Sequence, residues 1–434
     1  MKNFIKCFII FILLFGCTVN DNYIDELIEN LQKSSTESFS DEYKKLEEYT
    51  ENNMNLQIAK KIISAINYNF PKREYDFFDT QEDLIRLLRE YKKPDIIPYY
   101  EEIFSGVSKH AKREIIFCLT QINSPVAVKS VFNLLETTTQ DNLDCLVLYG
   151  WNSNFYQSDE IFPGLLDYIE IKPYQYEILY TLYLYLSENK LRFDKIKSRL
   201  DKFLIIYYIL EESINNLKID YTKSNWVFDE NYVEYRSEKA LLLDIFGYFD
   251  DESITKLLEE NTGSKDPRII YFAIISLYRH KKEINPVVVN KIAADNEMRK
   301  WIFDFLDENR LRNKYPSKYF NQTDLAISDM VNWLIYPTEL GSAPDHISLE
   351  KILTEKIDGF EHDFFIFKFK VDPPHWAADD GWMAGVAGPF KKDEQPTIKG
   401  SGHTFSNFAA WESKSAEEHF EDITGLVAGS NKNR

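Results

Sequence analysis

The sequence lacks any hydrophobic run long enough to cross a membrane as a helix. A span needs roughly 20 apolar residues, because the hydrocarbon core is about 30 Å thick and a helix rises about 1.5 Å per residue. The apolar run at residues 7–15 is much shorter. The chain also has no P-loop and no G-x-S-x-G, H-E-x-x-H or G-x-G-x-x-G motif, so the strongest sequence signals of common enzyme classes are missing.

Positive charge is scarce. Lys and Arg number 51 against 70 Asp and Glu, which gives a formal net charge of −19. No Lys- or Arg-rich stripe interrupts this trend. Because such a chain is repelled by phosphate backbones, we expect no nucleic-acid partner.

The N-terminus has the layout of an export signal. Lys2 and Lys6 precede the short apolar run, and a small residue closes it. The letters LFGC at residues 14–17 resemble the lipobox of bacterial lipoproteins. The resemblance implies that residues 1–16 are removed and that Cys17 carries acyl chains, which hold a soluble body on a bilayer. Two alternatives stay open: a buried N-terminal helix with an incidental cysteine, and an uncleaved anchor.

The same resemblance extends to location. Lipoprotein sorting patterns favour the outer membrane, where the organism has one, for a chain with Thr18 rather than Asp after the modified cysteine. Removal of residues 1–16 takes away two lysines and no acid, so the net charge falls from −19 to −21. We therefore expect a bacterial cell-envelope protein that contacts the membrane through its acyl chains, with residues 17–40 as the lipidated tether.

Cysteine is also rare, with four residues in the chain. If Cys7 leaves with the signal and Cys17 is acylated, Cys118 and Cys145 remain, and neither belongs to a C-x-x-C pair. An envelope compartment permits a disulfide between them. The apolar, helical surroundings of Cys118 instead suit a buried thiol. Both alternatives stay open, and the helical context favours two thiols.

From about residue 41 to residue 312 the pattern is helical. Thr80 precedes apolar residues at helical spacing and has an acid three residues on, which predicts a Thr N-cap. Three further segments open with a proline, at Pro94, Pro125 and Pro286. Proline is accepted in the first turn of a helix, so each is predicted to begin one.

The alternation of these segments resembles HEAT-like repeats, in which paired antiparallel helices stack into a superhelix. Two stretches carry the resemblance, 94–135 and 266–295. The second has an apolar stripe from Ile269 to Leu277, although Ile270 stands where the family usually has Arg. The resemblance implies an α-solenoid with a long surface for partners. The alternative is an irregular helical array.

The last part of the chain, residues 325–434, has a different composition. It holds nine of the 15 glycines and five of the seven histidines. Alternating apolar and polar residues predict strands there, so we expect a small α+β domain with three or more strands. The expected elements are strands at 363–372, 381–390 and 403–411, and helices at 325–335, at 346–353 and after an N-cap at Ser415.

Two sets of side chains in this domain are candidate site residues. His and carboxylates on glycine-rich loops bind metals or transfer protons, and exposed tryptophans anchor interfaces. Structural readings stand beside these, because Asp-Asp-Gly forms turns and a histidine also packs against aromatic rings. The catalytic candidates are His375, Asp379, Asp380 and His403, and the binding candidates are Trp376, Trp382 and Trp411.

The first functional hypothesis is a membrane-tethered lipoprotein that acts as a non-catalytic scaffold for a protein or peptide partner, with no metal or cofactor. One alternative is a metal-dependent or hydrolytic enzyme whose site lies in residues 325–434. Another is a protein that neutralises a toxin at the membrane. Substitution of His375, Asp379 or His403 separates the first two hypotheses, because an enzyme would lose turnover whereas a scaffold would keep binding.

Overall fold

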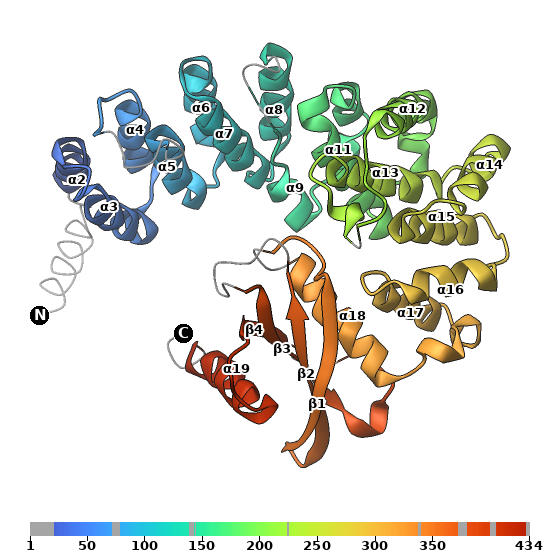
Figure 1. Ribbon diagram of the computed structural model, residues 1–434. Helices are drawn as coiled ribbons and strands as arrows, with labels where there is room; N and C mark the ends of the chain where they lie inside the picture. The colour runs from blue at the N-terminus through green and yellow to red at the C-terminus, as the bar shows by residue number, and fades with distance from the viewer. Residues whose placement is uncertain are drawn as a thin grey trace, which may run out of the picture. The chain divides into compact units, whose positions relative to one another are not determined.

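The structure is a computed structural model in which the described residues are mainly helical. They form 18 α-helices and one four-stranded antiparallel sheet near the C-terminus (Figure 1), which confirms the expected mainly α chain with a small sheet. Contacts divide the chain into two compact units, Met1–Lys202 and Phe203–Arg434. Within the described ranges, no helix combines the length and the apolar character that a membrane span requires. Those ranges are 21–71, 79–138, 143, 145–223, 225–336, 340–371, 380–399 and 405–430.

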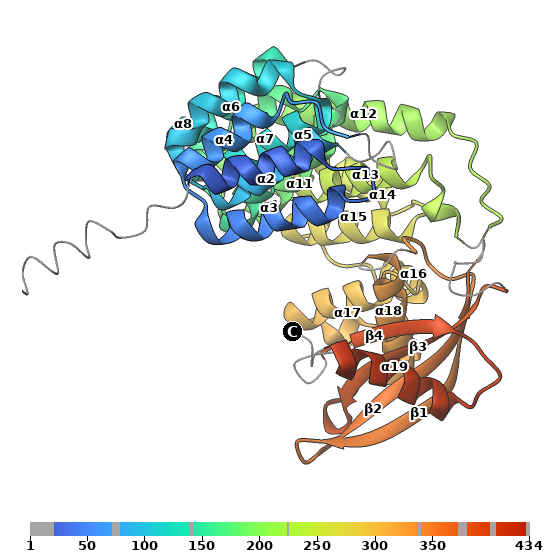
Figure 2. The same cartoon turned by 90° about the vertical axis from the view of Figure 1, so that its left-hand side faces the viewer.

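The helices of the first unit lie in two rows. Each helix packs against the helix two places further along the chain, so that α3, α5, α7, α9 and α11 form one row and α2, α4, α6, α8 and α10 the other (Figures 1 and 2). The helices are α2 (Asp21–Lys33), α3 (Phe39–Asn53), α4 (Leu56–Ala65), α5 (Thr80–Leu87), α6 (Ile97–Ile103), α7 (Lys109–Gln121), α8 (Pro125–Thr137), α9 (Tyr149–Asn154), α10 (Ser158–Ile161) and α11 (Lys172–Ser187).

Proline begins helices where the sequence predicted it. α8 starts at Pro125, and the Oγ atom of Ser124 caps it by accepting a hydrogen bond from the backbone N–H of Ala127 at 3.2 Å. α16 starts at Pro286, and Pro94 opens a short 3-10 turn that runs into α6. The first turn tolerates proline because its N–H groups have no partner inside the helix.

The cap of α5 differs from the prediction by one residue. α5 begins at Thr80, but the capping side chain is Asp79, whose Oδ1 accepts a hydrogen bond from Gln81 N at 2.9 Å. The predicted Thr80 N-cap is therefore wrong. The carboxylate one position earlier reaches the N–H groups of the first turn, and Thr80 is already helical.

Both described cysteines are reduced thiols that form no disulfide. Cys118 is buried on α7, and burial raises the pKa of its thiol. Cys145 is partly exposed, with its Sγ 3.8 Å from a guanidinium nitrogen of Arg113. The structure therefore agrees with the thiol alternative.

The second unit combines eight helices with the sheet. Its strands follow the order β1-β2-β3-β4, and every neighbouring pair is antiparallel. The helices are α12 (Leu200–Asn216), which carries the division between the units, α13 (Val233–Phe246), α14 (Glu252–Asn261), α15 (Pro267–Arg279), α16 (Pro286–Ala294), α17 (Arg299–Glu308), α18 (Gln322–Ile335) and the C-terminal α19 (Ala416–Ser430). The strands are β1 (His346–Ile357), β2 (Phe360–Lys370), β3 (Trp382–Lys391) and β4 (Phe405–Ala410).

β1 replaces the helix predicted at residues 346–353. An irregularity in its pairing with β2, between Leu349 and Lys351, shifts the alternation of the strand. Ile347 and Leu349 before it pack on the α18 side, whereas Leu353 after it packs on the α19 side. Leu349 and Leu353 are four residues apart in the sequence, which imitates helical spacing, but in the strand they lie on opposite faces of the sheet.

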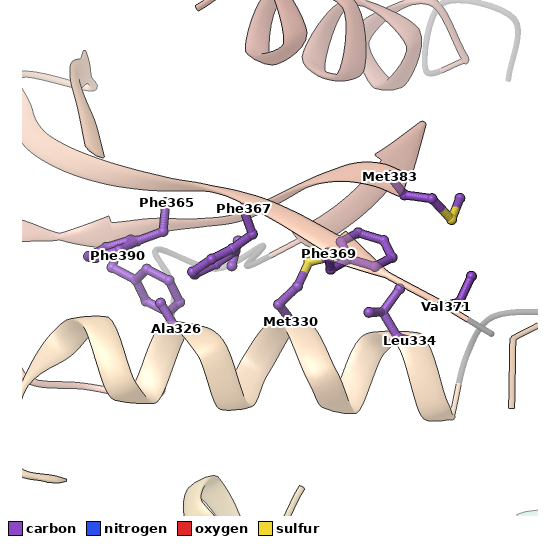
Figure 3. Close-up of a cluster of buried hydrophobic side chains, with 10 residues drawn as sticks. Ala326, Met330, Leu334, Phe365, Phe367, Phe369, Val371, Met383 and Phe390 are labelled. Carbon is purple, nitrogen blue, oxygen red and sulfur yellow. The ribbon is translucent and has the colours of Figure 1, made fainter. Parts of the chain in front are cut away.

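The two faces of the sheet pack against different helices. On β2, the predicted stripe of alternating apolar residues faces α18, and Figure 3 shows Met330 and Leu334 of that helix directed at it. The intervening residues Phe364 and Ile366 face α19. Full burial of such a side chain contributes about 1.5–3 kcal/mol, so both helices are held firmly on the sheet. The stripe comprises Phe365, Phe367, Phe369 and Val371.

Candidate binding site on the C-terminal sheet

The structure describes three of the seven sequence-predicted site residues, and it brings these three together. The Oδ1 atom of Asp380 accepts a hydrogen bond from Trp382 N at 3.0 Å, in the turn that precedes β3. Trp411 N in turn donates to the carbonyl oxygen of Trp382 at 2.9 Å. The other four site residues, and the predicted lipidation site, lie outside the described residues: His375, Trp376, Asp379, His403 and Cys17.

Strand register places four side chains in one row across the sheet. Lys370 of β2 lies opposite His346 of β1 and opposite Trp382 of β3. Trp411 directly follows β4 and is bonded to Trp382 through the backbone. Because opposed residues of antiparallel strands project to the same side, His346, Lys370 and Trp382 share a face. Lys370 and Ile366 are four residues apart on β2, so their side chains project to the same side of the sheet. Ile366 packs against α19, and the shared face is therefore the one that α19 covers.

Lys368, two residues earlier on the same face, joins both indole rings. Its Nζ lies 4.8 Å from the ring centroid of Trp382 and 4.9 Å from that of Trp411. The Nζ of Lys370 is 5.8 Å from the Trp382 ring. A cation over an aromatic ring gains about 0.5–1 kcal/mol at an exposed site, so two rings hold one ammonium group. We call Lys368, Lys370, Trp382 and Trp411 the tryptophan–lysine cluster; all four are partly exposed.

Helix α19 fixes the position of the second ring. Trp411 stacks on His419 with ring centroids 4.5 Å apart and planes 26° apart, and His419 is buried. The start of α19 is capped reciprocally: Ser415 Oγ accepts from Glu418 N at 3.3 Å, and Ser415 N donates to Glu418 Oε2 at 2.8 Å. The predicted cap at Ser415 is thus confirmed, and it helps to hold His419 beneath the indole.

The cluster has the chemistry of a binding surface. Two indole faces offer apolar contact, and two ammonium groups offer charge, while His346 packs edge-on to Trp382 with centroids 5.8 Å apart and remains exposed. A group with an apolar part and an anionic part would meet both kinds of contact. Within the described residues, no set of three or more His, Cys, Asp and Glu side chains is placed to hold a metal ion.

Sequence reasoning missed the two lysines and His346 as members of this site. Lys368 and Lys370 alternate with the stripe that faces α18, but their aromatic neighbours come from β3 and from the end of β4. The alternation of residues shows which face a side chain occupies. It does not show which residue of the next strand lies opposite.

A second polar cluster in this unit is buried and was not predicted. Arg236 of α13 donates from Nε and Nη2 to Asp266 at 2.7 and 3.1 Å, and from Nη1 and Nη2 to Glu297 at 3.2 and 2.7 Å. Tyr232 donates to Asp266 at 2.9 Å, and Tyr336 donates to Glu297 at 2.6 Å. These residues come from α13, the start of α15, the turn before α17 and the end of α18. The cluster therefore ties four parts of the unit together.

Burial and neighbouring charges shift the pKa values of Arg236 and of the nearby Asp295. Burial alone would lower the pKa of the Arg236 guanidinium. The two carboxylates outweigh this effect and raise the pKa above its ordinary value. Burial, and then the negative charge of Glu297, raise the pKa of Asp295 to about 6. Asp295 also accepts a hydrogen bond from Met298 N at 2.9 Å, near the start of α17. Asp295, which lies beside the cluster, is thus a carboxyl group whose pKa is well above its ordinary value.

No protein-family model, no characterised protein sequence and no solved structure matches this chain.

Proposed function

We propose that the protein is a lipoprotein of a bacterial cell envelope, tethered by acyl chains on Cys17, that binds a protein or peptide partner and catalyses no reaction. The first unit serves as a scaffold in the form of a HEAT-like α-solenoid. The tryptophan–lysine cluster is the surface that contacts the partner.

One observation carries the binding part of the proposal: the ammonium group of Lys368 lies over the rings of both Trp382 and Trp411. Partly exposed tryptophans are the residues that most often dominate binding energy at interfaces. Here their positions are set in advance by the sheet and by His419. A preorganised surface loses less conformational entropy on binding. The matching partner segment carries a carboxylate beside an apolar side chain.

The scaffold part rests on how the helices of the first unit pack. Contacts between helices two apart in the sequence build two parallel rows, from α2 to α10 and from α3 to α11. A two-helix repeat that stacks on its neighbours produces this contact pattern. The proline-started helices α6 and α8 fall in the same row, as the repeat interpretation requires.

Photo-crosslinking in living cells tests the binding surface. A benzophenone amino acid in place of Lys370 is expected to give a discrete crosslinked product with the full-length chain. The same probe in place of Val126, which is 60 % exposed on α8 in the other unit, serves as the control position. The product is expected to disappear in the double variant W382A/W411A and to persist in W333A, a matched loss of an exposed tryptophan on α18. Identical products from both probe positions, or a product that survives W382A/W411A, would contradict the proposal.

Metabolic labelling with a palmitate analogue tests the tether separately. We expect the wild-type chain and the control C118S to incorporate label and to fractionate with membranes, and C17S to do neither. Label that persists in C17S would refute lipidation at that residue. The binding surface is assayed independently, so either half of the proposal can fail alone.

A further inference from the structure

The second unit contains a cavity that the tryptophan–lysine cluster does not use. Its volume is about 370 Å³, within the range of about 300–1,000 Å³ that is usual for small-molecule sites. Its walls come from α12, from the segment between α12 and α13, from α13 itself, and from the end of α14 with the turn that follows it. The cavity is therefore formed by the packing of several elements.

Aromatic side chains that are fixed by their neighbours form one wall. The edge-to-face pair of Tyr221 and Trp226 has centroids 4.9 Å apart, and Trp226 also contacts Tyr232 at 5.3 Å. Tyr232 is buried and donates to Asp266. The Nζ of Lys265 lies 4.0 Å from the Tyr221 centroid. These contacts hold flat apolar surfaces in place at the cavity.

Polar groups line the inner end. The Nδ2 of the buried Asn261 donates to the hydroxyl of Tyr207 at 2.8 Å, and a hydroxyl that accepts one bond still has a hydrogen to donate. Lys239, also buried, is paired with Glu211 and lies over the Tyr207 ring. These groups keep their protein partners, but a purely apolar ligand would leave their remaining hydrogen-bonding capacity unused, at a cost of about 1–3 kcal/mol for each atom so affected. The ligand must therefore form hydrogen bonds.

The charges that line the cavity balance. Two lysines, Lys239 and Lys265, face two glutamates, Glu211 and Glu260. An anion or a cation would thus meet a group of its own sign as well as one of the opposite sign. A neutral ligand with hydroxyl groups meets acceptors and donors alike. The weakly positive C–H groups on the face of a sugar ring also pack well on the negative face of an aromatic ring.

We propose that this cavity is a binding site for a neutral saccharide, stacked on Trp226 and Tyr221 and hydrogen-bonded to Asn261, Lys239 and Glu211. The site is separate from the tryptophan–lysine cluster and does not depend on the proposed function. It assigns a ligand class to the segment between α12 and α13.

Saturation-transfer NMR with the full chain tests the site. Glucose, N-acetylglucosamine, maltose and cellobiose are the neutral probes, and glutamate and lysine are the charged ones. We expect transfer to the ring C–H protons of at least one saccharide, and at least a tenfold loss of affinity in W226A. W333A, which removes a tryptophan outside the cavity, is expected to bind like the wild type.

A second variant keeps the test decisive if W226A folds poorly. Tyr221 is 48 % exposed, so Y221A is expected to fold and still to weaken saccharide binding several-fold. The proposal is overturned if none of the four saccharides binds, or if binding is unchanged in Y221A. It is also overturned if glutamate or lysine binds more tightly than every saccharide, because the site would then select charge.

Discussion

Replacement of Arg236 by methionine tests whether the buried ion cluster holds the second unit together. The side chains of Arg236, Asp266 and Glu297 are only 1 %, 1 % and 4 % exposed. R236M would therefore leave two carboxylates buried without their common counter-ion. Removing one partner of a buried ion pair costs about 3–5 kcal/mol, and here one guanidinium serves two carboxylates. We expect the free energy of unfolding to fall by at least about 4 kcal/mol, a large share of the roughly 5–15 kcal/mol typical of a domain.

Urea denaturation of the full chain, followed by tryptophan fluorescence and circular dichroism, measures the loss. R312M is the control, because Arg312 and its partner Asp307 are 47 % and 36 % exposed and such pairs contribute about 1 kcal/mol or less. The triple variant R236M/D266N/E297Q removes every charge of the network and is expected to recover most of the loss. Asn at position 266 preserves the cap of α15. The reasoning is refuted if R236M costs no more than R312M, or if the triple variant is no more stable than R236M.

Three further predictions concern single sites. G150A is expected to destabilise the first unit by about 3 kcal/mol in urea denaturation, because an added Cβ would lie 2.4 Å from backbone of α7, whereas G106A, with open space around it, is expected to be neutral. D295N is expected to match the wild type near pH 4 and to exceed its stability at pH 8 by at most about 3 kcal/mol. The pKa of Asp295 is about 6 in the folded chain against 3.8 ordinarily, so the wild type loses the stability that the protonated carboxyl gives as the pH rises through 6. Equal pH profiles for D295N and the wild type would contradict this prediction. In iodoacetamide labelling, Cys145 is expected to react in the folded chain and Cys118 only in urea, because Cys118 is buried with a raised pKa; rapid labelling of both would exclude this.

Features fixed by neighbouring residues could be predicted from the sequence. Pro125 begins a helix because its missing N–H is not needed in the first turn, and Ser415 caps α19 through a residue only three positions away. The stripe of alternating residues on β2 was also correct, since period-2 alternation follows directly from strand geometry. In each case the physical cause lies within a few residues of its effect.

Features set by strand register and by distant pairing could not be predicted. Leu349 and Leu353 have a helical spacing in the sequence, and only the pairing with β2 reveals the irregularity that puts them on opposite faces of a strand. Arg236 meets acids that lie 30 and 61 residues further along the chain. Nothing near Arg236 in the sequence marks it as buried, because a charged residue on a helix is usually exposed. The surroundings of Lys368 could not be predicted for the same reason, because the two rings that it contacts belong to Trp382 on β3 and to Trp411 after β4.

The positive charge of the tryptophan–lysine cluster matters because the chain as a whole is acidic. With a net charge of −19, the protein as a whole attracts basic partners over distances up to the Debye length, about 8 Å at physiological salt. A basic segment that reached the cluster would meet Lys368 and Lys370, and like charges in contact cost affinity. An acidic segment gains little from the long-range field but finds both ammonium groups at contact. Under the proposed function, the cluster therefore adds selectivity rather than speed of association, because it favours the segments that the rest of the surface does not attract.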